Sequence, residues 1–436
     1  MGRAIRMSQI ERHAHDRQAR RRWGPLAPAC QNGEFSTSPN CVAGHASYCH
    51  VVSRLGRLRQ HVTLPPTPIS SPVVPSQTDS SVVFPISWIL KHGASPVQYR
   101  ALTNVARLSN PPARLLSLVY SYYPGPRLAI SQQVDGIWNR SMLSVPLPGS
   151  NNFEGVGTIT AFRRLLELGW EKDSPPMLSG RRILFRLLAE DNDPTFLFEF
   201  GADARVPELR SRGRLILREA AAAALAQAGY ESDPRLRGCA QRIVRRVGDF
   251  LASPLAADPW VRIGNKHVLA PEASPPSIHL LTMLAHMPHF QSEHQHFMAL
   301  LFDFLSRPLP RQESQQALGS HIVAQSHFVL GDQLATRNMV DGDVPSALNW
   351  LELMARLGFL RRNEHWERLF QRFLGERNRD AVWRPGKGVL PLPSAAPDTW
   401  PMYPLDTRAE SNAVAAEVTL RLGIIARASG RTLELV

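Results

Sequence analysis

The chain has 436 residues, of which 43% are hydrophobic and 20% are charged, so it is long and apolar enough to bury a sizeable core. Its formal net charge is +13 at pH 7, but only four residues are lysine, and the basic residues do not gather with aromatic ones as in nucleic-acid-binding faces. No apolar run approaches the roughly 18–20 residues of a membrane-spanning helix, so we expect neither a nucleic-acid partner nor a membrane span.

Residues 1–80 differ in composition from the rest of the chain. They are rich in Arg, then in Cys, His and Ser, and then in Pro and Ser, and they show no helical or strand period. They lack the apolar segment of a secretory signal, and the four cysteines of the whole chain make no disulfide framework. We therefore predict a disordered tail on a cytoplasmic protein. The alternative is upstream sequence included by a misplaced start codon.

The same segment contains a group of potential zinc ligands, which consists of Cys30, Cys41, His45, Cys49 and His50. A tetrahedral zinc site usually takes its ligands from short paired arms such as Cys-x-x-Cys, and this spacing has none. We therefore expect no metal here.

Helical signals begin near Pro85. We predict a short helix that ends at Gly93, and then a second helix with Ser95 as its N-cap and Pro96 in the first helical position. Another apolar helix follows over residues 115–122, before a Pro-Gly-Pro sequence interrupts the chain.

Residues 129–170 carry the clearest local pattern. A turn at Asp135-Gly136 precedes Trp138, which we expect to be buried, and an amphipathic helix then runs to Gly169, where a left-handed residue would end it. The apolar stripe of this helix is Ile159, Phe162, Leu165, Leu166 and Leu168. Its opposite side carries Arg163, Arg164 and Glu167.

Helical hairpins of this kind recur along the chain. Each has an apolar helix, usually ended by a small residue, then a polar turn and a second apolar helix. The first helices are predicted to end at Gly169, Gly229, Met287, Gly358 and Gly423, which gives spacings of 60, 58, 71 and 65 residues by subtraction. No alternating pattern of useful strand length is present. The predicted fold is therefore all-α, a barrel or partial barrel of helical hairpins over residues 81–436.

The motif Gln132-Gln133-Val134-Asp135-Gly136-Ile137-Trp138, together with these two-helix modules, resembles the α/α-toroid superfamily of terpenoid cyclases and protein prenyltransferases. It is most similar to uncharacterised bacterial toroid proteins described as prenyltransferase-like. A degenerate second copy of the motif is present at Asp380-Ala381-Val382-Trp383. The resemblance implies an α/α toroid with an isoprenoid-like or other hydrophobic small molecule in its central cavity.

The catalytic signatures of that superfamily are weak in this chain. Class II cyclases use an Asp-x-Asp-Asp run, and its nearest equivalent makes Asp191 and Asp193 candidate acids; a solvated turn at a helix end is the alternative. Prenyltransferases hold zinc with an Asp, a Cys and a His. Cys239 lies among apolar helical neighbours and is expected to be a buried packing residue, so we predict no cofactor.

Two histidines are further catalytic candidates. His279 and His286 are two helical turns apart, on one face of a helix that we expect to begin near Ser277, and Pro288 should break that helix. If the face lines a cavity, the imidazoles are placed for proton transfer or metal binding. We expect instead that it faces solvent, with both rings titrating near the ordinary value of about 6.5.

Trp138, Trp170 and Trp350 are candidates for lining a hydrophobic cavity, with interhelical packing as the alternative. Two functions remain open: a protein that binds or converts a hydrophobic small molecule, and a non-catalytic helical scaffold for an unknown protein partner. A wide cavity with an acid or a histidine at its base favours the first function. A core filled by side chains favours the second.

Overall fold

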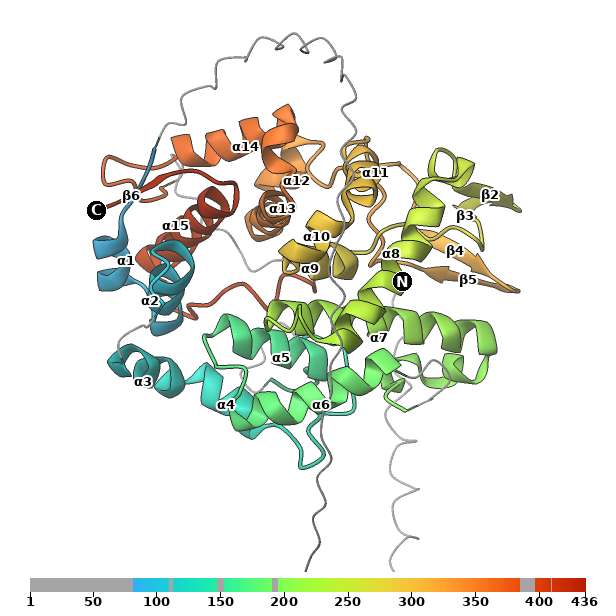
Figure 1. Ribbon diagram of the computed structural model, residues 1–436, viewed down its shortest axis with the longest axis horizontal. Coiled ribbons are helices and arrows are strands. Elements are labelled where there is room, and N and C mark those ends of the chain that lie inside the picture. Colours follow the sequence, from blue (N-terminus) through green and yellow to red (C-terminus); the bar gives the residue numbers. More distant parts are fainter. Residues whose placement is uncertain (1–80, 110–112, 147–152, 190–194, 385–396, 409) are drawn as a thin grey trace, which may run out of the picture. The chain divides into compact units, whose positions relative to one another are not determined.

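The computed structural model describes residues 81–436 except 110–112, 147–152, 190–194, 385–396 and 409 (Figure 1). The predicted tail and its group of potential zinc ligands therefore lie outside the described residues. The described part is mostly helical, with a small mixed sheet. Within these ranges no helix combines the length and the apolar character needed to cross a bilayer.

The first half of the described chain contains eight α-helices, one π-helical segment and one 3-10 helix. They are α1 (Ile86–His92), α2 (Ser95–Arg100), the π-helical η1 (Ala101–Val105), α3 (Ala113–Ser121), α4 (Pro124–Ile130), α5 (Thr158–Glu167), α6 (Pro175–Ala189), the 3-10 helix η2 (Phe198–Arg205), α7 (Pro207–Gln227) and α8 (Pro234–Leu251).

The second half continues with short and long helices. They are η3 (Pro254–Ala256), α9 (Ile278–Ala285), α10 (Pro288–Glu293), α11 (Gln295–Leu305), α12 (Arg337–Asp341), α13 (Val344–Arg356), η4 (Leu360–Arg362), α14 (Glu364–Gly375) and α15 (Ser411–Ala428).

Five helices that are far apart in the sequence contact one another in succession (Figure 1). α5 packs on α7, α7 on α9, α9 on α13, and α13 on α15. α15 also packs on η1 and α2. Ion pairs from Glu167 of α5 to Arg100 of α2 and to Arg421 of α15 connect both of these helices back to α5. α6 packs on α7, and α8 on α6 and α7, so they form a second layer beside the first.

Most of the predicted helix ends are confirmed. Gly169, Gly229 and Gly358 follow the ends of α5, α7 and α13 with φ of 92°, 82° and 73°, in the left-handed region that glycine adopts without strain. The predicted end at Gly423 is wrong, because α15 continues through it. A side chain at Gly423 would collide with the ring of Phe84, so this glycine permits close packing. The left-handed stop after α15 is Gly430, at φ 80°.

The start of the described chain departs from its prediction by one residue. α1 ends before Gly93, as expected, but α2 already begins at Ser95, so its N-cap is Ala94. Ser95 therefore does not cap the helix. The backbone N–H of Ala94 donates to the Asp406 carboxylate at 3.1 Å. Asp406 therefore satisfies one of the backbone N–H groups that the start of a helix leaves without an intrahelical acceptor.

Strands are present although none was expected. β1 (Val82–Phe84) and β6 (Leu433–Leu435) pair in parallel. A four-stranded sheet contains the hairpin β2 (Trp260–Ile263) and β3 (Lys266–Leu269), joined to the hairpin β4 (Gln315–Leu318) and β5 (His321–Ala324) by a parallel pairing of β3 with β4. Three or four residues are too few for an alternating pattern to be recognised in the sequence.

The turn before α5 buries its tryptophan, as predicted. Gln133 and Ile137 are joined by a 2.8 Å backbone hydrogen bond, and Gly136 has φ 91°. Trp138 is fully buried. Its indole N–H donates to the Leu128 carbonyl at 2.7 Å, so its one polar atom is satisfied.

The degenerate copy forms the same turn. Asn378 N donates to Val382 O at 2.8 Å, Ala381 takes the place of the glycine at φ 58°, and Trp383 is buried. In both copies the tryptophan backbone N–H donates to a threonine hydroxyl, which is Thr158 of α5 at 3.0 Å in the first copy and Thr419 of α15 at 2.9 Å in the second. The two turns are thus structurally equivalent although their sequences share little.

Replacement of Trp138 by alanine should destabilise the protein by about 3–5 kcal/mol, because it removes a fully buried indole and leaves a cavity. Urea unfolding measures the loss. Tyr123→Ala is the matched control, since 69% of Tyr123 is exposed, and it should leave the midpoint almost unchanged. Equal midpoints for both variants would contradict the packing role of Trp138.

Candidate functional site

A segment that we call the strap, residues 397–408, lies against α5 and α15. From α5, Arg164 donates to the carbonyl oxygens of Trp400 at 3.0 Å and of Pro404. From α15, Arg421 donates to the Met402 carbonyl, and Glu417 accepts from the Leu405 backbone N–H at 2.7 Å. Buried charged side chains thus hold the backbone of an irregular segment in place.

A cavity of about 540 Å³ lies between the start of the strap and the helices α5, α7 and α9. Most of its wall surface is made by apolar atoms, and its apolar residues are Leu143, Val145, Ile159, Phe200, Ile216, Ile278, Pro397 and Pro401. Its polar wall is Ser144, Thr160, Arg163, Glu199, Arg212, His279, Ser326, His327 and Asp398. A concave, mainly apolar site with a few convergent polar groups is typical of a small-molecule site.

Arg163 is the most deeply buried cation in this wall, with 5% of its surface exposed. Its Nε donates to Gln227 Oε1 at 3.0 Å, and Gln227 in turn donates to Glu167 Oε1 at 2.6 Å. Burial lowers the pKa of Arg163, against the opposing effect of Asp398 and Glu167. Gln227 therefore fixes the guanidinium at the edge of the cavity.

The imidazoles of His279 and His327 lie side by side, with ring centroids 6.4 Å apart and planes inclined by 17°. Burial, and then the charge of Arg163, lowers the pKa of His279 to about 3. Burial also holds the pKa of His327 well below its ordinary value. Both rings are therefore neutral at physiological pH, which corrects the expectation that His279 faces solvent and titrates freely.

Asp398 brings a carboxyl group to the same cavity. Burial raises its pKa, and the Asn349 side chain donates to its Oδ2 at 3.4 Å. A carboxyl group with a raised pKa holds its proton at a higher pH than an exposed aspartate, so a larger fraction of it carries a proton that can be donated at a given pH.

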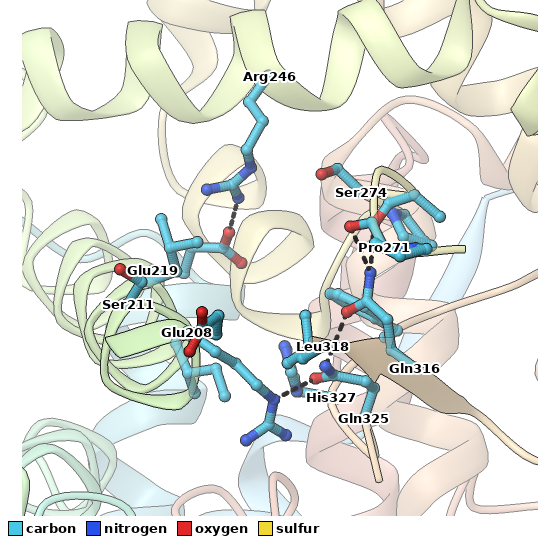
Figure 2. A pocket seen from close by; sticks show the side chains of 16 residues that line it. Glu208, Ser211, Glu219, Arg246, Pro271, Ser274, Gln316, Leu318, Gln325 and His327 are labelled. Atoms are coloured by element: carbon cyan, nitrogen blue, oxygen red, sulfur yellow. Dashed lines mark hydrogen bonds and ion pairs between the residues drawn. The ribbon is translucent and has the colours of Figure 1, made fainter. Parts of the chain in front are cut away.

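A second cavity, of about 190 Å³, adjoins the first and shares Arg212, Ile216 and His327 with it (Figure 2). One side is held by side-chain amides: Gln325 donates to Gln316 Oε1 at 2.8 Å, and Arg212 Nε donates to Gln325 Oε1 at 2.8 Å. These bonds tie the β4–β5 hairpin to α7. They keep His327, two residues beyond Gln325, between the two cavities.

The opposite side of the second cavity is held by Glu219 of α7 (Figure 2). Its carboxylate pairs with Arg246 of α8 and accepts from the hydroxyl of Ser277, the N-cap of α9. One buried carboxylate thus joins three helices. Its charge is compensated by Arg246, as a buried acid requires.

Behind Arg163 lies a network of buried ion pairs. Glu167 pairs with Arg100 at 2.5 Å and with Arg421 at 3.4 Å, and Glu352 pairs with Arg421 at 3.5 Å and with Arg356 at 2.9 Å. Burial alone would raise the pKa of Glu167, but the two arginines outweigh it and lower that pKa to about 2. The network is thus fully ionised at physiological pH.

His286 lies beside this network rather than in the cavity. Its Nδ1 lies 3.0 Å from the Thr282 carbonyl. Burial and the charge of Arg356 lower its pKa to about 4. α9 begins after Ser277, as predicted, but it ends at Ala285, so His286 is its C-cap and the two histidines do not form one wall. Neither ring titrates as a solvated imidazole would.

The other sequence candidates have different positions. Asp191 and Asp193 lie outside the described residues. Trp138 packs in its turn, Trp170 packs edge-on against Tyr120 at 5.0 Å, and Trp350 packs edge-on against Trp366 at 6.0 Å. None of the three tryptophans lines either cavity.

Cys239 is buried in α8, as predicted, and burial raises the pKa of its thiol to about 11. It is therefore an inert packing residue. Among the described residues, no group of three His, Cys, Asp or Glu side chains is arranged to hold a metal ion.

Three residues of the cavity were not identified from the sequence. Arg163 was placed on the polar side of an amphipathic helix, a pattern that usually indicates solvent, yet this side faces the interior. Asp398 lies in a proline-rich segment without periodicity, and His327 follows a short hairpin. A sequence signal for Arg163 is that its helix and the helix over residues 411–428 both carry Arg and Glu among apolar residues.

The pH dependence of the His279 ring tests its position. Because burial and Arg163 disfavour its protonated form, its ring protons should show no titration as the pH falls from about 7 to about 5. NMR spectra over this range, assigned with His279→Gln, measure this. A midpoint near 6.5 would show that the His279 ring is exposed to solvent.

Glu417 of α15 should make the folded protein less stable as the pH rises. Burial raises its pKa from 4.5 to about 7, although Arg421 and Arg164 oppose this. The folded chain therefore holds this proton more tightly than the unfolded chain, and stability is lost between about pH 4.5 and pH 7. Thermal midpoints of the wild type should fall relative to Glu417→Gln across this window. Parallel pH curves would contradict the raised pKa.

Comparison of the chain with protein-family models, with curated proteins and with solved structures gave no match. The toroid resemblance therefore depends on the motif, the helical modules and the contacts between helices. The function has to be inferred from the chemistry of the cavity.

Proposed function

We propose that residues 81–436 form an α/α toroid that binds a largely apolar, isoprenoid-like or related small molecule and converts it by proton transfer. Two features support the toroid. The contacts from α5 through α7, α9, α13 and α15 return to α5 at Glu167. The tryptophan turn recurs at Trp138 and Trp383, as repeats of such a fold would require.

The proton-transfer function is supported chiefly by one observation: the Asp398 carboxyl group shares a mainly apolar cavity with two neutral imidazoles. Burial raises the pKa of Asp398 in the direction found in general acids, and it keeps the two imidazoles in the neutral form that can accept a proton. In this proposal Asp398 donates a proton to the substrate, and His279 or His327 accepts one. The apolar wall holds the substrate body and excludes water, which strengthens the electrostatic effects.

The scaffold alternative receives less support from the same geometry. A scaffold has no need of a concave site in which buried polar side chains converge. A cavity of about 540 Å³ with convergent acid and histidine side chains is more easily explained by a small-molecule ligand.

Binding is tested with phenylnaphthylamine, an uncharged probe whose fluorescence increases in apolar surroundings. The wild type should bind it, and Ile278→Trp should reduce binding at least about tenfold because the larger side chain fills the cavity. Ile130→Trp is the matched control, since Ile130 is 83% exposed. Equal binding by the two variants would place the probe elsewhere.

Conversion is tested with Asp398→Asn, which keeps the shape of the side chain but cannot donate an acidic proton. Wild type and variant are incubated with a small-molecule extract, and consumed compounds are identified by mass spectrometry. The wild type should consume a compound that the variant leaves intact, while both bind phenylnaphthylamine alike. Consumption by neither protein, or by both equally, would argue against proton transfer by Asp398.

A further inference from the structure

The guanidinium of Arg163 is only partly hydrogen-bonded. Nε donates to Gln227, but the two terminal amino groups have no acceptor among the described residues. The side chain is 95% buried and lines the cavity of about 540 Å³. Arginine keeps its charge in proteins, so these N–H groups are strong donors that remain available to a ligand in the cavity.

No neighbouring carboxylate compensates this charge by direct contact. Glu167 is already paired with Arg100 and Arg421. Asp398 forms no ion pair with Arg163, and burial favours its protonated form. Glu199 accepts from the Ser141 hydroxyl at 2.7 Å and from the Leu143 backbone N–H at 2.6 Å. A buried cation without a partner is costly, so the cavity favours an anion beside Arg163.

We infer that the ligand of this cavity is an apolar carboxylic acid, whose carboxylate accepts hydrogen bonds from the two terminal amino groups of Arg163. This inference rests on the proposed function and specifies its substrate class. A guanidinium presents parallel N–H groups that match the two oxygens of a carboxylate. The apolar body of the acid would then lie against Ile159, Ile216 and Ile278.

A single negative charge fits the site better than a phosphate or diphosphate. The other arginine of the wall, Arg212, already donates to Gln325 at 2.8 Å and to the Ala324 carbonyl. His279 and His327 are neutral and so add no charge. The Glu199 carboxylate lies in the same wall, so with Asp398 protonated as the proposed proton donor the formal charges of Arg163, Arg212 and Glu199 sum to +1. A monoanionic carboxylate neutralises this charge, and a multiply charged phosphate exceeds it.

The test compares decanoate with methyl decanoate, which differ in charge but hardly in shape, as competitors of phenylnaphthylamine. Arg163→Gln should weaken the binding of decanoate at least about tenfold and change the binding of methyl decanoate by less than about threefold. Arg262→Gln is the matched control, and it should change the binding of both ligands by less than about threefold, because Arg262 is exposed and lines neither cavity.

Three outcomes would overturn the inference. Arg163→Gln could leave decanoate binding unchanged, or it could weaken both competitors equally, which would indicate a packing role. Inorganic phosphate could displace the probe from the wild type at lower concentration than decanoate, which would indicate a phosphate site. In each case phenylnaphthylamine still binds, so the proposed function stands. If the wild type binds no probe at all, the proposed function fails first.

A readout on the wild type alone remains decisive if Arg163→Gln does not fold. His279 shares the cavity wall with Arg163, Glu199, Arg212, His327 and Asp398. A carboxylate bound at Arg163 offsets the positive charge that disfavours protonation of His279, so saturating decanoate should raise the pKa of His279, and methyl decanoate should not. NMR titration measures this, and an equal response to both ligands would contradict the inference.

Discussion

The ion pairs of Glu167 with Arg100 and Arg421 are the contacts on which the rest of the structure depends. They connect α5 with α2 and α15, and Arg421 extends the network to Glu352 on α13. Removing one partner of such a buried pair costs about 3–5 kcal/mol, because the remaining charge loses its compensation. The network is complete only when all four helices are in place. It therefore disfavours other packings that bury the same apolar surface but leave these charges apart.

The chemistry of the cavity follows from this network. Glu167 holds Gln227, which holds Arg163, so the same carboxylate that joins the helices also orients the cation at the cavity wall. Arg421 and Arg164 in turn hold the strap that carries Asp398. The catalytic candidates are thus supported by buried hydrogen bonds from rigid helices. Such support is what keeps reactive groups in a fixed geometry.

The sequence predicted those features that local signals determine. Helix ends at Gly169, Gly229 and Gly358, the Trp138 turn and the break at Pro288 all depend on a few neighbouring residues. The cavity depends on which way each helix faces once distant helices have met. An amphipathic pattern normally indicates an apolar core and a polar surface, but the polar side of α5 faces other charges inside the protein. Only the tertiary contacts reveal this inversion, and with it Arg163 and Asp398.

The parallel pairing of β1 with β6 has a consequence for folding. Val82 lies opposite Leu433, so about 350 residues separate the two partners along the chain. Such a contact has a large loop-closure cost unless the intervening helices have already brought the two strands together. During synthesis β1 emerges first and stays unpaired while every helix of the body is made. The edge of β1, which has only apolar side chains, must therefore remain soluble in an incomplete chain. Lys91 of α1 and Arg100 of α2, which follow it in the sequence, favour this.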